Sequence, residues 1–187
     1  MSRLTRADVI QAAMDLLETG GVAALTIPAV ALKLNIRPPS LYNHIESMSD
    51  LKRELSIRGM RQICQVWSSA VEGKTGQDAL VCATAAYRKF AREHSALYAL
   101  SLVVPPASDE EWSKAFKDFL PLWMELFLSF GLDPLHARYA ARALRCTVHG
   151  FVDLEINGGL LEDVDLEESF QSIVSTLISC LHSSSVR

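Results

Sequence analysis

The chain lacks the signatures of several large protein classes. Its four cysteines, Cys64, Cys82, Cys146 and Cys180, stand far apart, without a C-x-x-C pair or a Cys/His spacing typical of zinc. It also lacks the G-x-S-x-G, H-E-x-x-H, P-loop and dinucleotide motifs of common enzymes. We therefore expect buried reduced thiols, no metal, no cofactor, no catalytic residues and no enzyme activity. The alternative of an all-helical enzyme would need a catalytic cluster, and His149 with Asp153 is the nearest pair to one.

Long apolar runs are missing as well. No run approaches the roughly 20 residues that span a bilayer, and the opening MSRLTRADVI has no apolar signal-peptide region. Apolar residues make up 49% of the chain and charged residues 21%, which is typical of a globular protein. We expect a cytoplasmic protein without a membrane partner, and 187 residues permit one domain or two.

The chain has no overall surplus of positive charge, since its formal net charge is −4. The charge is unevenly distributed. Residues 1–62 hold eight Lys/Arg and six Asp/Glu, whereas residues 63–187 hold ten and sixteen. An acidic remainder is compatible with nucleic-acid binding at the amino-terminal part, because salt screens charges beyond about 10 Å.

Residues 26–36 carry the pattern of a short helix and a tight turn. Thr26 can cap the helix, and Pro28 falls in its first turn, where a missing N–H costs nothing. Asn35 tolerates the left-handed backbone that a sharp turn requires. Helical spacing of apolar residues supports this interpretation at Ile27, Val30, Ala31 and Leu34. The pattern predicts a helix-turn-helix.

The second helix of this unit should begin near Arg37, with two prolines in its first turn, and continue through His44. Leu41 and Ile45 would face the core. Arg, Ser and Asn side chains can reach base edges, and Tyr and His can donate to phosphates. The alternative is an ordinary helical hairpin with solvated polar residues. The outward residues would be Arg37, Pro39, Ser40, Tyr42, Asn43 and His44.

These residues carry a family resemblance. The run L-x-I-x-x-x-S-L-Y-x-H-I over residues 34–45, preceded by T-x-x-x-V-A over residues 26–31, resembles the tetracycline-repressor (TetR) family of bacterial transcription regulators. The resemblance implies an all-α protein of about nine helices. A three-helix DNA-binding domain would occupy residues 1–47, and a helical bundle with a ligand pocket and a dimer interface would occupy residues 48–187.

The resemblance also implies phosphate contacts outside the helix-turn-helix. Related proteins commonly place a Lys at the start of the next helix, where this chain has Met48. Lys52 or Arg53 is the candidate substitute, and a solvated surface charge is the alternative. Arg3 and Arg6 would touch phosphate or the minor groove, or form a solvated arm. The expected DNA-binding residues are Thr26, Arg37, Pro39, Ser40, Tyr42, Asn43, His44 and Lys52.

Capping patterns divide the rest of the chain into helices. Thr5-x-x-Asp8 opens the first helix, and the glycine pair at residues 20–21 should end it. Ser47-x-x-Asp50 opens a long helix. Ser108-x-x-Glu111 should open an aromatic-rich helix that a proline at position 121 kinks. An Asp-Pro pair at 133–134 caps the penultimate helix.

Aromatic residues recur every three or four positions between residues 112 and 130. Such a stripe is typical of a core, and it also suits a cavity for an apolar or flat ligand. His149 is a candidate ligand contact, with a satisfied core histidine as the alternative. The candidate pocket residues are Trp67, Tyr87, Phe90, Trp112, Phe116, Trp123 and His149.

The last two predicted helices have apolar arcs too wide for one neighbour, which indicates burial on two sides. A homodimer through a four-helix interface would supply the second side, and a central helix in a monomer is the alternative. The run TVHGFVDLEINGG at 147–159 resembles the subgroup with a WHG-type carboxy-terminal domain. The expected interface residues are Leu144, Val148, Phe151, Val152, Phe170, Val174, Leu177, Ile178 and Leu181.

Together these features predict a repressor that binds a palindromic operator as a homodimer and is released by a small apolar or aromatic effector. A dimeric DNA-binding regulator without an effector is the alternative within the same family.

Overall fold

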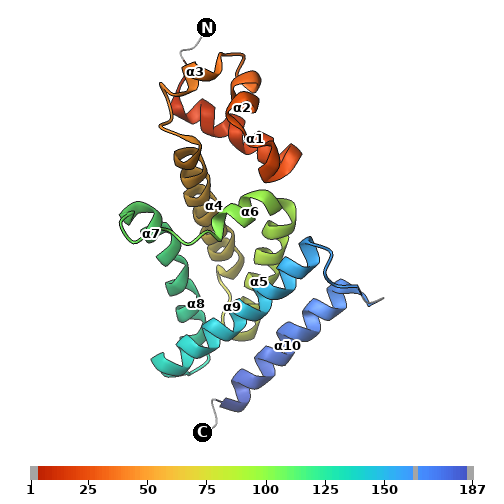
Figure 1. The fold of residues 1–187 in the computed structure, drawn as a ribbon. Helices are drawn as coiled ribbons and strands as arrows, with labels where there is room; N and C mark the ends of the chain where they lie inside the picture. Colours follow the sequence, from red (N-terminus) through yellow and green to blue (C-terminus); the bar gives the residue numbers. More distant parts are fainter. Residues whose placement is uncertain (1–3, 162–163, 185–187) are drawn as a thin grey trace. The chain divides into compact units, whose positions relative to one another are not determined.

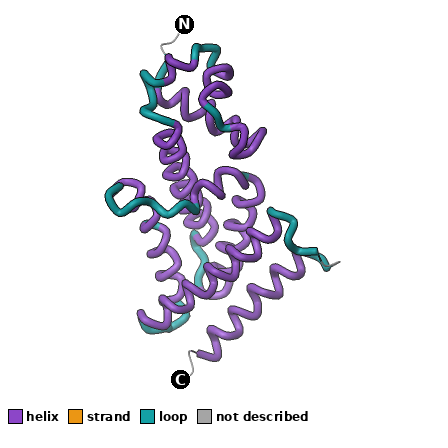
Figure 2. Tube along the Cα trace, viewed as in Figure 1, coloured by secondary structure: helices purple, strands orange, loops and turns teal. Residues whose placement is uncertain are grey.

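In the computed structural model of the protein, the described residues are 4–161 and 164–184, and they form helices and no strand (Figures 1 and 2). The expected all-α fold is therefore confirmed. The described part of the chain contains the ten helices α1 (Arg6–Ala24), α2 (Ile27–Lys33), α3 (Pro38–Leu41), α4 (Met48–Val71), α5 (Gly76–Glu93), α6 (Ser95–Ser101), α7 (Glu110–Lys117), α8 (Phe119–Leu128), α9 (Pro134–Ile156) and α10 (Leu166–Ser184).

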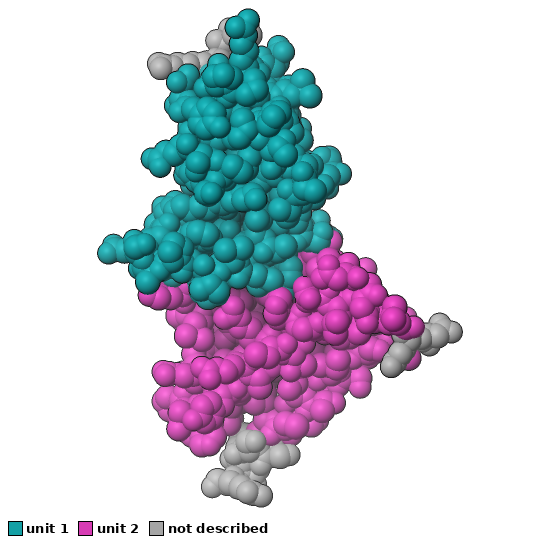
Figure 3. Space-filling model, in the orientation of Figure 1, with its two compact units in different colours: residues 1–62, 93–116 teal, residues 63–92, 117–187 magenta. Residues whose placement is uncertain are grey.

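The chain forms two compact units, coloured separately in Figure 3. The first comprises residues 1–62 and 93–116, and the second comprises residues 63–92 and 117–187. This division differs from the expected boundary between residues 47 and 48. The reason is that α6 packs against α1, so α6 and α7 join the amino-terminal helices, and the carboxy-terminal third of α4 belongs to the second unit.

The start of α1 has the predicted capping box. The Thr5 N–H donates to Asp8 Oδ2 at 2.8 Å, and the Asp8 N–H donates to Thr5 Oγ1 at 3.2 Å. The helix breaks at Gly21, which has φ of 67°, as the glycine pair predicts. A short helical stretch then continues to Ala24, where α1 ends.

The predicted aromatic helix is two helices. The cap of α7 is Asp109 rather than Ser108, because the Trp112 N–H donates to Asp109 Oδ1 at 3.1 Å. The helix ends at Lys117, four residues before Pro121. A proline has no N–H to offer the carbonyl four residues earlier, and its ring crowds that carbonyl. Pro121 therefore separates α7 from α8 instead of kinking a continuous helix.

A buried arginine joins three helices of the second unit. Arg88 on α5 donates two hydrogen bonds to Glu155 of α9, at 2.8 and 2.7 Å, and one to Glu167 of α10 at 2.7 Å. Its guanidinium carbon lies 4.7 Å from the centroid of the Phe170 ring. Arg88 is 5% exposed. The two bonded carboxylates offset the free-energy cost of burying the positive charge of the guanidinium.

The cysteines are less buried than expected. Cys64 and Cys82 are half-buried, and Cys146 and Cys180 are exposed, so the expectation of four buried thiols is wrong. Cys146 lies on α9, and Cys180 lies on α10, where it lines a groove with Leu177 and Leu181. Within the described ranges, no helix is long and apolar enough to cross a membrane.

Candidate nucleic-acid interface

The helix-turn-helix forms as the sequence predicts. Thr26 caps α2, since its Oγ1 accepts the Ala29 N–H at 3.3 Å. Asn35 adopts φ of 53° in the turn, and the Ile36 N–H then donates to the Ala31 carbonyl at 3.0 Å. The left-handed residue therefore closes α2 and reverses the chain before Arg37.

The second helix is shorter than predicted. Only Pro38–Leu41 is α-helical, and residues 42–44 follow as hydrogen-bonded turns, with the His44 N–H donating to the Leu41 carbonyl at 2.8 Å. The two prolines set the first turn, and Arg37 precedes it in an extended conformation. Leu41 is fully buried and Ile45 is 2% exposed, as their spacing predicts.

Six of the eight predicted DNA-binding side chains are exposed. Tyr42 is 56% exposed. Ser40 and His44 are half-buried, so they reach less far from the surface than the others. The exposed members are Thr26, Arg37, Pro39, Tyr42 and Asn43, with Lys52 exposed on α4.

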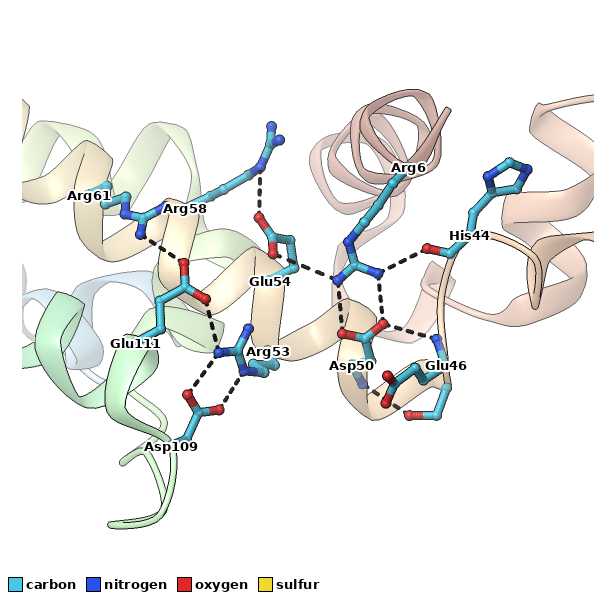
Figure 4. A network of polar contacts seen from close by, with 11 residues as sticks. Arg6, His44, Glu46, Asp50, Arg53, Glu54, Arg58, Arg61, Asp109 and Glu111 are labelled. Atoms are coloured by element: carbon cyan, nitrogen blue, oxygen red, sulfur yellow. Dashed lines mark hydrogen bonds and ion pairs between the residues drawn. The ribbon is translucent and has the colours of Figure 1, made fainter. Parts of the chain in front are cut away.

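An ion-paired cluster holds the end of this segment against α1 and α4. Arg6 donates to both oxygens of Asp50 at 2.9 Å and to the His44 carbonyl at 2.9 Å (Figure 4). Asp50 Oδ2 also accepts the Glu46 N–H at 3.0 Å. Arg6 lowers the pKa of the Asp50 carboxyl, despite the opposing effect of its partial burial.

This contact changes the expectation for Arg6. The Arg6 guanidinium bonds α4 and the backbone of residues 37–44, the reading segment. It is therefore neither a solvated arm nor an uncommitted phosphate ligand. Arg3 lies outside the described residues. Arg6 and Asp50 are 44 residues apart in sequence, and no local pattern identifies them as partners.

A second cluster joins α4 to the start of α7. Arg53 donates from Nε and Nη2 to the two oxygens of Asp109 and bonds Glu111 at 3.1 Å, and Arg61 bonds Glu111 at 3.1 Å (Figure 4). The Arg53 guanidinium lowers the pKa of the Asp109 carboxyl to about 2. Arg53 is therefore occupied within the chain, and the neighbouring Lys52 is exposed.

Three of the seven candidate pocket residues lie in one aromatic cluster of the second unit. The ring centroids of Trp67 and Trp123 are 4.0 Å apart, and Tyr87 lies 6.5 Å from Trp123. Phe119, which was not among the pocket candidates, contacts all three rings at 5.5 to 6.1 Å. All four side chains are at most 5% exposed.

The other four pocket candidates are distributed differently. Phe90 is buried on α5, and His149 is half-buried on α9. Trp112 and Phe116 lie on α7 and belong to the first unit. The even spacing of the aromatic residues in sequence did not indicate this division, because it continues across the break before α8.

Most of the candidate dimer residues are buried within the single chain. Leu177 and Leu181 are half-exposed. These two side chains line an apolar groove of about 270 Å³ between α8, α9 and α10, with Phe127, Ala143 and Leu144. The residues already covered by the chain's own helices are Leu144, Val148, Phe151, Val152, Phe170, Val174 and Ile178, with exposures of 7% or less.

The chain matches two family descriptions. Residues 9–55 match "Bacterial regulatory proteins, tetR family", and residues 80–177 match "Tetracyclin repressor-like, C-terminal domain". An uncharacterised HTH-type transcriptional regulator of Mycobacterium tuberculosis, Rv0681, is 32% identical over 94% of this chain and 81% of its own length.

Solved structures share the fold. A protein of unknown function from Rhodococcus sp. RHA1 has a TM-score of 0.83 at 21% identity, covering 97% of both chains. A TetR variant from Acinetobacter baumannii AYE in complex with minocycline has a TM-score of 0.72 at 21% identity, covering 97% of this chain and 98% of that one. BioQ with its double-stranded DNA operator has a TM-score of 0.70 at 19% identity, covering 97% of this chain and 99% of that one.

Proposed function

The chain belongs to the tetracycline-repressor (TetR) family of transcriptional regulators, and on this premise we propose that it is a dimeric repressor whose DNA binding responds to a small apolar or aromatic effector. It would act in the cytoplasm on a palindromic operator. The observation that carries the proposal is the polar surface of the helix-turn-helix, where Arg37, Tyr42 and Asn43 are exposed beside a buried Leu41.

The chemistry of this surface suits double-stranded DNA. The Arg37 guanidinium and the Asn43 amide present donors that can read base edges in the major groove. The Tyr42 hydroxyl and the Lys52 ammonium can bind phosphate oxygens, which position the protein without reading sequence. Thr26, Pro39, Ser40 and His44 complete the surface, the last two from half-buried positions.

Two copies of the chain would bind one operator. A dimer presents its two reading segments at the spacing of successive major grooves, about 34 to 36 Å. We place the dimer contact on α9 and α10, at the groove with Leu177 and Leu181, because these side chains remain partly exposed. The seven buried candidate interface residues would pack under this surface and hold its two helices in place.

The effector would act by favouring a different spacing of the two reading segments. The aromatic cluster of Trp67, Tyr87, Phe119 and Trp123 supports an apolar or flat ligand in the second unit. The related fold in complex with minocycline is consistent with this assignment.

Fluorescence anisotropy tests the proposal. Purified protein is titrated against the intergenic DNA upstream of its own gene, with a scrambled duplex of equal length and composition, at physiological salt. We expect binding to the upstream duplex to be at least about a thousandfold tighter. Equal, weak and salt-sensitive binding to both duplexes would count against a specific regulator of this operator.

A further inference from the structure

Three buried polar side-chain atoms in the described part of the chain have no hydrogen-bond partner there, and all three are indole nitrogens. Two of them, Trp67 Nε1 and Trp123 Nε1, belong to the aromatic cluster of the second unit. Their rings are 1% and 2% exposed, and the centroids lie 4.0 Å apart with an interplanar angle of 42°. Two N–H donors without an acceptor therefore lie on neighbouring rings that are buried away from water.

The surrounding side chains explain why these donors lie in an apolar setting. Phe119 meets both indoles edge to face, at 5.6 Å and 85° to Trp67 and at 5.5 Å and 82° to Trp123. Tyr87 stacks on Phe119 at 6.1 Å and 12°. Aromatic rings therefore pack against the indole pair, and aromatic side chains favour contact with a further flat ring.

A buried N–H without an acceptor costs free energy, and in native proteins such a group calls for an explanation, such as strain, an ordered water or a functional role. An indole nitrogen donates and cannot accept. Any partner of these two groups must therefore carry acceptor atoms, such as carbonyl or ether oxygens.

The charges of the second unit limit the ligand further. Its buried cation, Arg88, is already bonded to Glu155 and Glu167, and the buried Thr84 hydroxyl donates to the Leu80 carbonyl at 2.9 Å. Burial and the nearby Asp118 raise the pKa of the Cys64 thiol, one turn before Trp67, to about 11, so it stays neutral. A carboxylate ligand would bury a full negative charge with two neutral indole donors and, among the described residues, no unpaired buried cation to offset it, so a neutral acceptor costs less to bury.

We propose that the Trp67–Trp123 pair is the recognition point for a neutral, largely apolar ring compound that carries a carbonyl-type acceptor. The compound accepts hydrogen bonds from the indole N–H groups and packs its ring against Phe119 and the indole faces. The inference rests on the proposed function, because it defines the chemical class of the effector.

A matched pair of probes tests the acceptor requirement. 1-Tetralone and tetralin share the same two-ring skeleton and differ at the carbonyl oxygen. Equilibrium dialysis gives the Kd of each, and the ratio of the two Kd values is compared between the wild type and the double variant Trp67→Phe/Trp123→Phe. Because hydrophobicity affects both proteins alike, the change in the ratio isolates the indole N–H groups.

We expect the preference for tetralone to fall by about tenfold or more in the double variant. The matched control is Thr84→Val, which removes a buried donor of the same unit that is already bonded within its own helix. This control should leave the ratio unchanged. An unchanged ratio in the double variant, or no binding of either probe up to its solubility limit, overturns the proposal.

A measurement on the wild type covers the case in which the double variant does not fold. The chain has three tryptophans and so gives three indole N–H signals in a ¹⁵N-correlated NMR spectrum. Two of them should move downfield with tetralone and stay in place with tetralin, and single Trp→Phe variants assign them. If no indole signal moves downfield with tetralone, the proposal is overturned. This includes the case in which a tightly held water occupies the donors and the probe does not displace it.

The DNA titration is run on the same preparations to distinguish failure of the ligand site from failure of the proposed DNA-binding function. Specific DNA binding without an acceptor preference would remove this site and leave the regulator. An acceptor preference without specific DNA binding would leave the site and remove the proposed function.

Discussion

Single side chains determine how the reading segment is presented. Asn35 supplies the left-handed turn, and the extended Arg37 follows two residues later, before α3 begins. Because the backbone on both sides of Arg37 is constrained by Asn35 and by two prolines, its exposed guanidinium starts from a defined position. A base contact made from such a position loses less conformational freedom on binding.

The first prediction concerns Arg37→Ala. If Arg37 reads a base, the substitution should weaken binding to the cognate duplex by about 1 to 3 kcal/mol and relax the preference at one base pair. Anisotropy titrations against duplexes with single base-pair changes measure this. Lys74→Ala, at an exposed cation in the turn after α4, is the charge-matched control and should keep the preference. Equal losses on cognate and random DNA would refute the base contact.

The second prediction concerns Tyr42→Phe, which removes only a hydroxyl from a ring that is 56% exposed. Loss of one neutral phosphate contact should weaken binding to all sequences alike and leave the salt slope unchanged, because the slope counts the phosphates that Lys and Arg neutralise. Titrations of the cognate and random duplexes at four salt concentrations give both quantities. Unchanged affinity for both duplexes would mean that the hydroxyl does not contact phosphate.

At the scale of elements, α4 connects the parts of the first unit. Near its start it holds Arg6 and the reading segment through Asp50, and one turn later it holds α7 through Arg53. Further along, it approaches α6 closely. A Cβ at Gly59 would lie 1.9 Å from Ser101 Oγ and 3.2 Å from Leu97 Cγ.

The third prediction follows from this approach. Gly59→Ala should lower the free energy of unfolding by about 1 to 3 kcal/mol, because Ser101 is fully buried and cannot move away without strain. Ser101→Ala removes the clashing oxygen, so the double variant should regain part of the loss. Urea denaturation of all four proteins gives the coupling. Additive effects would show that the added methyl group does not clash with the Ser101 oxygen.

The fourth prediction concerns the ion pair between α4 and α7. The Asp109 pKa lies at about 2 in the folded chain, below its ordinary value of 3.8, because Arg53 favours the carboxylate. The pair therefore stabilises the fold fully above about pH 4 and loses this effect as pH falls toward 2. Asp109→Asn should flatten the dependence of the urea midpoint in that window, with a remainder from Asp50 and Glu111. An equally steep dependence in the variant would contradict this.

At the scale of the whole molecule, the proposed repressor is a dimer that reads the two half-sites of one operator. The surface proposed for the dimer contact is the part of α9 and α10 that the chain's own helices leave exposed. Leu177 is the informative position, because it is half-exposed in the groove while its neighbour Ile178 is 4% exposed.

The fifth prediction is that Leu177→Glu converts the proposed dimer to a monomer with unchanged helical content. A monomer loses the gain of binding two half-sites at once, so affinity for the operator should fall by about a hundredfold. Analytical ultracentrifugation and circular dichroism measure the two properties. Val104→Glu, at a 75% exposed position after α6, is the control and should stay dimeric. A dimeric Leu177→Glu would place the interface elsewhere.

The sequence by itself determined the features that depend on near neighbours in the chain. Helical spacing, the caps at Thr5, Thr26 and Asp133, and the left-handed Asn35 follow from contacts within about four residues, and the structure contains each of them. The family followed from a run of twelve residues for the same reason, since that run specifies one local structure and its exposed face.

Tertiary structure alone decided the features that depend on a choice among distant partners. Arg6 could have met solvent, phosphate or a carboxylate, and packing brought it to Asp50. Helical spacing marked both sides of α9 and α10 as apolar, but which side faces the chain's own core depends on how the other helices pack. The indoles at positions 67 and 123 meet for the same reason. Periodicity gives the face of a helix that is buried, and only packing gives what buries it.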